Sequence, residues 1–103
     1  MTSSSTAPPA NAGSHPSVPE RAPAALQRIV ASIAELADDA SVPRNVRRGA
    51  QNAIEELAKR QVALDVRVAG AVYVLDDLAN DPNLPTHGQT AIWTIISNLE
   101  SLP

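Results

Sequence analysis

Three arginines in the middle of the chain have the residue type and spacing of a ligand-binding cluster. Arg44, Arg47 and Arg48 are so close in sequence that a helix places them on one face of its first turns. Guanidinium groups bind phosphates and carboxylates, which predicts a docking site for RNA or for an acidic surface of a partner protein. The alternative is an internal ion-pair network, in which acidic residues such as Asp76 and Asp77 neutralise the cluster.

Trp93 is the second candidate for a binding residue. It is the only Trp in a chain whose aromatic content is 2%, and it stands beside Ile92 in an apolar stripe. In one interpretation the indole fills a gap between packed hairpins, and Trp93→Ala then costs about 3–5 kcal/mol of stability. In the other it anchors a protein interface, where Trp is enriched among the residues that carry binding energy.

Residues suited to catalysis or metal binding are sparse. The chain has no Cys, which excludes disulfides and thiolate metal sites. His87 is interpreted as a polar residue in the first turn of a helix, and the Asp- and Asn-rich loops at 37–41 and 80–83 lack the ligand spacing of a calcium-binding loop. No glycine-rich phosphate loop or nucleophile elbow occurs. We therefore expect no catalytic residue, no metal and no cofactor, and a protein that is not an enzyme.

An internal repeat indicates which residues the architecture itself requires. The segment 36–57 recurs loosely, 42 residues later, as 78–99. The identical positions are Leu36/Leu78, Ala37/Ala79, Asp39/Asp81, Pro43/Pro85, Ile54/Ile96 and Leu57/Leu99. Such a repeat means that one supersecondary unit is used twice. Neither the three arginines nor Trp93 is matched by a like residue in the other copy, so these residues are the best candidates for function.

Apolar residues at helical spacing predict four helices. The predicted helices begin near Pro23, Pro43, Leu64 and Pro85. The segment 64–79 also fits a strand because its valines alternate, but the repeat aligns it with the first helix and favours a third one. We therefore predict an all-α fold: a four-helix antiparallel bundle of two repeated helix-loop-helix hairpins, similar to two HEAT-like repeats. Its two Asp-rich loops should lie side by side at one end.

Composition divides the chain into a tail and a domain. Residues 1–20 are rich in Ser and Pro and are predicted to be disordered, whereas 21–103 form the bundle domain. The net charge is −3, but 41–67 carry +3 and 68–103 carry −4. A chain that is acidic overall has no general attraction for nucleic acid or anionic membranes. No apolar run reaches the length of a membrane span and no leader pattern occurs, which predicts a cytoplasmic protein without membrane association.

Three stretches are distinctive together: SVPRNVRRGA at 41–50, VYVLDDLANDPN at 72–83, and the P-x-H and IW that follow. Through them, residues 24–101 resemble the small archaeal proteins grouped as uncharacterised protein family 0147. The resemblance implies a four-helix bundle and an archaeal, cytoplasmic origin, and it carries no established activity and no catalytic residues. The chain departs from the family pattern in its Ser/Pro-rich tail and at Gly88, where a bulkier residue is usual. Residues 38–57 also resemble the second half of a HEAT repeat, which supports an interaction role by analogy.

These observations predict a non-enzymatic protein-interaction module. Its partner would be a protein, for example a ribonucleoprotein or translation component, bound through the Arg44/Arg47/Arg48 end and the flank that carries Trp93. The alternative is direct RNA binding by the arginine cluster, whose affinity would fall steeply with salt. A third reading is a purely structural homodimer, so both a monomer and a homodimer are compatible with the sequence.

Overall fold

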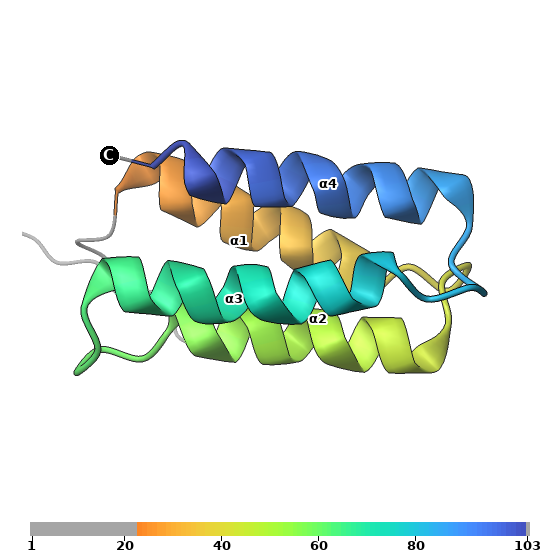
Figure 1. Ribbon diagram of the computed structural model, residues 1–103, viewed down its shortest axis with the longest axis horizontal. Helices are drawn as coiled ribbons and strands as arrows, with labels where there is room; N and C mark the ends of the chain where they lie inside the picture. The colour runs from red at the N-terminus through yellow and green to blue at the C-terminus, as the bar shows by residue number, and fades with distance from the viewer. Residues whose placement is uncertain (1–22, 103) are drawn as a thin grey trace, which may run out of the picture.

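The computed structural model describes residues 23–102 and folds them into four α-helices (Figure 1). The helices are α1 (Ala24–Ala37), α2 (Arg44–Leu57), α3 (Leu64–Ala79) and α4 (Thr86–Glu100). These described residues contain no strand, so the all-α prediction is confirmed and the ambiguous segment 64–79 is helical. The predicted disordered tail, residues 1–20, lies outside the described residues.

The four helices run alternately in opposite directions and close into a ring. Each helix packs against the next one in the chain, and α4 packs against α1, whereas the diagonal pairs α1–α3 and α2–α4 lie farther apart. Figure 1 shows the α1–α2 loop beside the α3–α4 loop at one end of the bundle, and we call this the paired-loop end. The α2–α3 loop, the start of α1 and the end of α4 lie at the opposite end. The predicted four-helix antiparallel bundle is confirmed, and it is a closed ring rather than an open stack of repeats.

The core is built from aliphatic side chains. Each helix turns an apolar face inward, and no polar or charged residue of the described chain is buried. The largest fully buried side chains are Leu26, Ile33, Leu57, Leu75, Ile92, Leu99 and Val46. Burying one Leu or Ile side chain is worth about 1.5–3 kcal/mol, and the chain has no Cys that could form a disulfide, so this packing holds the helices together.

A unit shorter than the predicted 42-residue repeat underlies the bundle. Leu36, Leu57, Leu78 and Leu99 are each 21 residues apart, and each lies at or next to the end of a helix. The three loops also close with one backbone hydrogen bond of the same kind. Its donor–acceptor pairs are Val42 N to Asp39 O at 3.1 Å, Val62 N to Lys59 O at 3.3 Å and Leu84 N to Asp81 O at 3.1 Å. The chain is therefore a series of similar helix-loop units, two of which make one hairpin.

Gly49 lets α2 and α3 approach closely. A Cβ atom at this position would lie 2.5 Å from Cδ2 and 3.0 Å from Cγ of Leu78, which is buried in α3. Such separations are below van der Waals contact, so any larger residue would force the two helices or the leucine to move. Gly49 therefore marks a close contact between α2 and α3.

Candidate functional site

Asp39, in the loop between α1 and α2, joins the two hairpins at the paired-loop end. Its Oδ1 accepts a hydrogen bond from the backbone N–H of Ser41 at 2.9 Å and another from the Ser41 hydroxyl. Its Oδ2 lies 3.0 Å from Nε2 of His87, in the first turn of α4. The Ser41 hydroxyl, the Ser41 N–H and His87 all favour the charged carboxylate, so the pKa of Asp39 falls from its usual 3.8 to about 2.

Asp81, in the loop between α3 and α4, makes the matching contacts. Its carboxylate accepts hydrogen bonds from the Asn45 side chain in α2 at 2.6 Å and from the backbone N–H of Asn83 at 2.7 Å. These two donors, Asn45 foremost, lower the pKa of Asp81. Asp39 and Asp81 are related by the 42-residue repeat, and so are Asn45 and His87. Each loop aspartate therefore binds the equivalent helix residue of the other hairpin, and the two loops lie side by side as predicted.

Asp39, Ser41 and His87 have the composition of a catalytic triad but not its geometry. In a triad the Asp and the Ser bind opposite nitrogens of the His ring, and the Ser gives its proton to the His. Here Asp39 and Ser41 both lie 3.0 Å from the same nitrogen, Nε2, and the Ser41 hydroxyl donates to Asp39. The arrangement is a clamp between a loop and a helix. Within residues 23–102, no group of three or more His, Cys, Asp or Glu side chains is placed to hold a metal ion.

Arg47, one of the three predicted binding arginines, is tied to the protein itself. It is half-buried, and its Nε donates to the backbone oxygen of Val42 in the preceding loop at 3.3 Å. Arg67, at the same place in α3, makes the same contact with Val62 at 2.9 Å. Each arginine thus supplies a hydrogen bond to a loop carbonyl, which indicates a structural role for Arg47.

Arg44 and Arg48 are exposed on α2 and remain the accessible part of the cluster. The ion pairs within residues 23–102 are Lys59–Glu56 and His87–Asp39. Neither pair includes an arginine, so the predicted internal network with acidic residues is not formed in this part of the chain.

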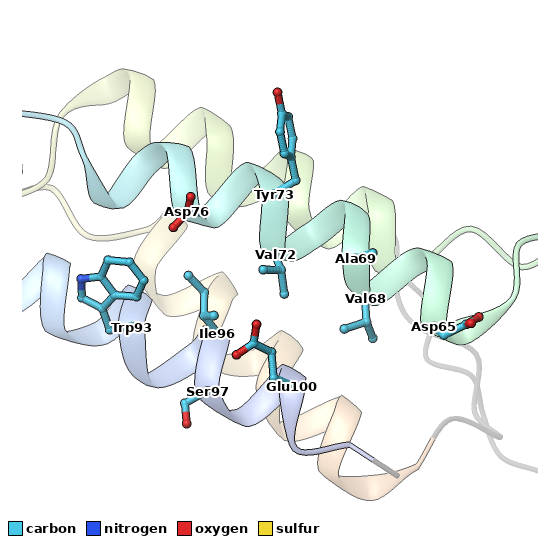
Figure 2. Close-up of a pocket in the computed structure, with 10 residues that line it drawn as sticks. All are labelled: Asp65, Val68, Ala69, Val72, Tyr73, Asp76, Trp93, Ile96, Ser97 and Glu100. Atoms are coloured by element: carbon cyan, nitrogen blue, oxygen red, sulfur yellow. The ribbon is translucent and has the colours of Figure 1, made fainter.

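Trp93 lies at the surface of α4 with 46% of its area exposed, so it does not fill a gap in the core. It stands at one end of an open groove of about 740 Å³ between α3 and α4 (Figure 2). The groove is lined by Asp65, Val68, Ala69, Val72, Tyr73, Asp76, Trp93, Ile96, Ser97 and Glu100. Trp93 therefore forms part of a recess in which a partner's side chains can be buried.

The groove has an apolar floor and an acidic margin. Figure 2 shows Val68 and Val72 pointing from α3 towards α4, with Ile96 facing them from α4. The charged residues that line the groove are all carboxylates: Asp65, Asp76 and Glu100. Tyr73 points away from the gap between the two helices and is 80% exposed at the outer edge.

The arginines and Trp93 do not share one surface. Arg44 and Arg48 belong to α2, whereas every residue that lines the groove belongs to α3 or α4. Because α2 and α4 are diagonal in the ring, the predicted docking surface separates into two. The sequence does not reveal the groove, because helical periodicity places Val68 and Val72 on an apolar face of α3 whether or not that face is covered. A signal was present in Tyr73, a large aromatic residue at the place where the repeat has Ala31.

None of the helices α1–α4 is both long and apolar enough to cross a bilayer.

Residues 16–102 match the sequence profile of the Uncharacterised protein family UPF0147. A UPF0147 protein of Thermoplasma volcanium is 48% identical over 68 residues, which are 66% of this chain and 76% of that protein. A UPF0147 protein of Saccharolobus islandicus is 38% identical over 86 residues, which are 84% of this chain and 97% of that protein. Both organisms are archaea, and the names of these proteins state no activity.

Two crystal structures share the fold. One is a UPF0147 protein from Thermoplasma acidophilum, with a TM-score of 0.74 and 42% identity, covering 77% of this chain and 93% of that one. The other is a protein of unknown function, with a TM-score of 0.76 and 40% identity, covering 84% of this chain and 99% of that one. Sequence and fold agree with the predicted resemblance, and the chain belongs to the uncharacterised protein family UPF0147.

Proposed function

We propose that this protein is a non-enzymatic protein-interaction module whose partner docks in the groove between α3 and α4. One observation carries the proposal. The chain has only two aromatic residues, Tyr73 and Trp93, and both line this groove at the surface while the core is aliphatic. Trp and Tyr are the residue types most enriched among the side chains that dominate binding energy at protein interfaces.

The exposed rings are large enough to matter for affinity. A partner that covers the open part of Trp93 removes on the order of 100 Å² of ring surface from water, which corresponds to about 2–3 kcal/mol at ~25 cal/mol/Å². Tyr73 adds to this where the partner extends over the outer edge of the groove. The floor residues add to this without any rearrangement, because they already lie on rigid helices. We propose a partner from a ribonucleoprotein or the translation machinery in the cytoplasm, since proteins that bind RNA carry many exposed Lys and Arg residues.

Affinity purification from an archaeal lysate tests the proposal. The chain, a Trp93→Ala variant and an Arg44→Gln/Arg48→Gln variant are compared with and without nuclease. We expect the unmodified chain and the arginine variant to recover the same protein after nuclease treatment, and Trp93→Ala to lose it. Recovery by Trp93→Ala at the level of the unmodified chain would refute docking in the groove.

The Trp93→Ala variant must be folded for this test to be decisive. Because the indole is half-exposed, its loss should cost clearly less than the ~3–5 kcal/mol that a buried Trp is worth. Circular dichroism and urea denaturation measure this directly. A loss in the full range for a buried Trp would restore the interpretation that Trp93 fills the core.

Direct RNA binding through Arg44 and Arg48 is the second candidate. It is supported by the exposure of both side chains and by their place in the first turns of α2. Positive charge there costs about 0.3–1 kcal/mol, and no ion pair within residues 23–102 offsets it. This function predicts nuclease-sensitive recovery that is lost in the Arg44→Gln/Arg48→Gln variant and retained in Trp93→Ala. Arg47 is left unchanged in this variant because it supports the loop before α2.

A further inference from the structure

We infer that the occupant of the α3–α4 groove is a basic amphipathic helix presented by the partner protein, an inference that rests on the proposed protein-interaction function. The apolar floor of the groove favours a partner helix with an apolar face, and its acidic margin favours positively charged residues beside that face. The arrangement of the lining residues along α3 and α4 then sets the length and register of the helix that fits.

The charge of the margin favours a basic occupant. Asp65, Asp76 and Glu100 line the groove, and no Lys or Arg does (Figure 2). Arg67 is the last basic residue of the chain other than His87, so neither α4 nor the rest of α3 supplies Lys or Arg. The ion pairs within residues 23–102 include none of the three carboxylates. Lys or Arg side chains of a partner would therefore meet these carboxylates without a competing cation.

Two of these carboxylates stand where they oppose the stability of their own helices. Asp76 lies in the last turn of α3 and Glu100 is the last residue of α4, and neither last turn contains a basic residue. The C-terminal end of a helix carries partial negative charge, which repels a carboxylate. A cation from a partner, placed at these ends, would relieve the repulsion as well as form ion pairs.

The spacing of the groove residues fits about three turns of helix. Asp65 and Asp76 are the first and last residues of the lining stripe on α3, and eleven residues of helix correspond to about 16 Å. Because α4 runs opposite to α3, Glu100 lies towards Asp65 and Trp93 lies towards Asp76 (Figure 2). An occupant thus needs basic residues about three turns apart with apolar residues between them. Arg suits the Trp93 end best, since its guanidinium can pair with a carboxylate and stack on an indole.

A helix fits this groove better than an extended peptide. The walls are two helices, whose side-chain ridges accept the ridges of a third helix. An extended peptide docks by adding to a sheet edge, and the described residues contain no strand that offers one.

Fluorescence of Trp93, the only tryptophan in the chain, provides a direct readout of the groove. The probe is a synthetic helical peptide without Trp or Tyr, with Leu at positions 1, 4 and 8 of its apolar face and Lys or Arg at both ends. A charge-inverted peptide with Glu at the same ends is the matched ligand. We expect the basic peptide alone to shift the Trp93 emission to the blue in a saturable way, and added salt to weaken the binding.

Two triple variants of the full chain locate the charges that matter. The groove variant is Asp65→Lys/Asp76→Lys/Glu100→Lys. The control variant is Glu35→Lys/Glu55→Lys/Asp77→Lys, which changes the net charge equally at exposed residues that do not line the groove. We expect the groove variant to lose affinity for the basic peptide by about tenfold or more, because three ion pairs become repulsive. It should gain affinity for the Glu peptide, and the control variant should keep the original preference.

Other outcomes overturn the inference. The absence of any emission shift with the basic peptide, equal binding of both peptides, or equal losses in the two triple variants would each exclude a basic helix in the groove. So would a homodimer in light scattering that the groove variant abolishes, because a second copy would then fill the groove. If the inference fails while the lysate partner still depends on Trp93, the proposed interaction function stands with a different occupant.

Discussion

At the scale of single residues, the paired-loop end depends on two half-buried aspartates, Asp39 and Asp81. Each of these carboxylates accepts a hydrogen bond from the backbone N–H two residues ahead. Each also contacts a polar side chain of the opposite hairpin, His87 for Asp39 and Asn45 for Asp81. The local turn is predictable from the sequence, because a loop Asp readily accepts the backbone N–H two residues further along. The contact across the hairpins is not visible in this way, because it depends on how the two loops approach in space.

The pKa of Asp39 makes the clamp sensitive to acid. The folded-state pKa of about 2 lies below the usual 3.8, so the stabilisation is present above pH 3.8 and is lost as the pH falls towards 2. We therefore expect Asp39→Asn to melt at a lower temperature than the unmodified chain at pH 5, and the difference to shrink between pH 4 and pH 2. A difference in melting temperature that stays constant over this range would show that ionised Asp39 does not contribute.

Replacing each of two helical glycines, Gly49 and Gly70, by Ala should change the stability of the protein in opposite directions. At Gly49 the added Cβ meets the branch of buried Leu78, so Gly49→Ala should destabilise the protein by about 1–3 kcal/mol despite the better helix propensity of Ala. At Gly70 the Cβ meets Oε1 of Glu56 at 2.7 Å, the mobile end of a side chain that can turn away. Gly70→Ala should therefore stabilise α3 by up to about 1 kcal/mol.

Urea denaturation of both variants at one pH measures the contrast. Both substitutions replace Gly by Ala within a helix, so helix propensity alone would change the free energy of unfolding in the same direction for both. Equal stabilisation would mean that α2 and α3 are not in close contact at Gly49.

At the scale of elements, removing a carboxylate charge from the first and from the last turn of α3 should change the stability of the protein in opposite directions. Asp65 lies in the first turn of α3 and also accepts the N–H of Val66 at 2.9 Å, so Asp65→Asn should destabilise the helix. Asp76→Asn and Glu100→Gln remove charge from last turns and should each stabilise the free protein by about 0.3–1 kcal/mol. Thermal melts at low ionic strength test this, and 1 M salt should reduce all three effects. Stabilisation by Asp65→Asn would contradict the argument.

The helices themselves could be predicted from the sequence with little error. Pro43 and Pro85 immediately precede α2 and α4, where the missing N–H costs nothing, and the apolar spacing identified the inward faces. The shorter helix-loop unit was missed because the middle loop differs in chemistry, and because its hydrogen-bonded residues lie 20 residues after and 22 residues before their counterparts. It has Lys59 where the other loops have Asp, and Ala63 where they have Pro, although its backbone follows the same path.

At the scale of the whole molecule, the bundle was predictable and its binding surfaces were not. Helical periodicity identifies the side of a helix that faces its neighbours, but it does not separate a residue at the core from one at the seam between two helices. Val68 and Val72 are such seam residues, half-buried between α3 and α4 and still open to a partner. The position of Arg44 and Arg48 away from Trp93 likewise depends on the order of helices around the ring.

The contacts between the loop aspartates and the opposite helices follow the rule of an isologous interface. In a two-fold homodimer, if residue i of one subunit contacts residue j of the other, then j contacts i. Here His87 is the counterpart of Asn45 in the repeat, and Asp81 is the counterpart of Asp39. Asp39 contacts His87 and Asn45 contacts Asp81, so the two contacts are related in this way. The α2–α3 and α1–α4 packings correspond under the same rotation, although the contact between α2 and α3 is more extensive than that between α1 and α4. The molecule is thus organised as a dimer of hairpins joined into one chain, and its two corresponding clamps differ in chemistry because one has Asn45 where the other has His87.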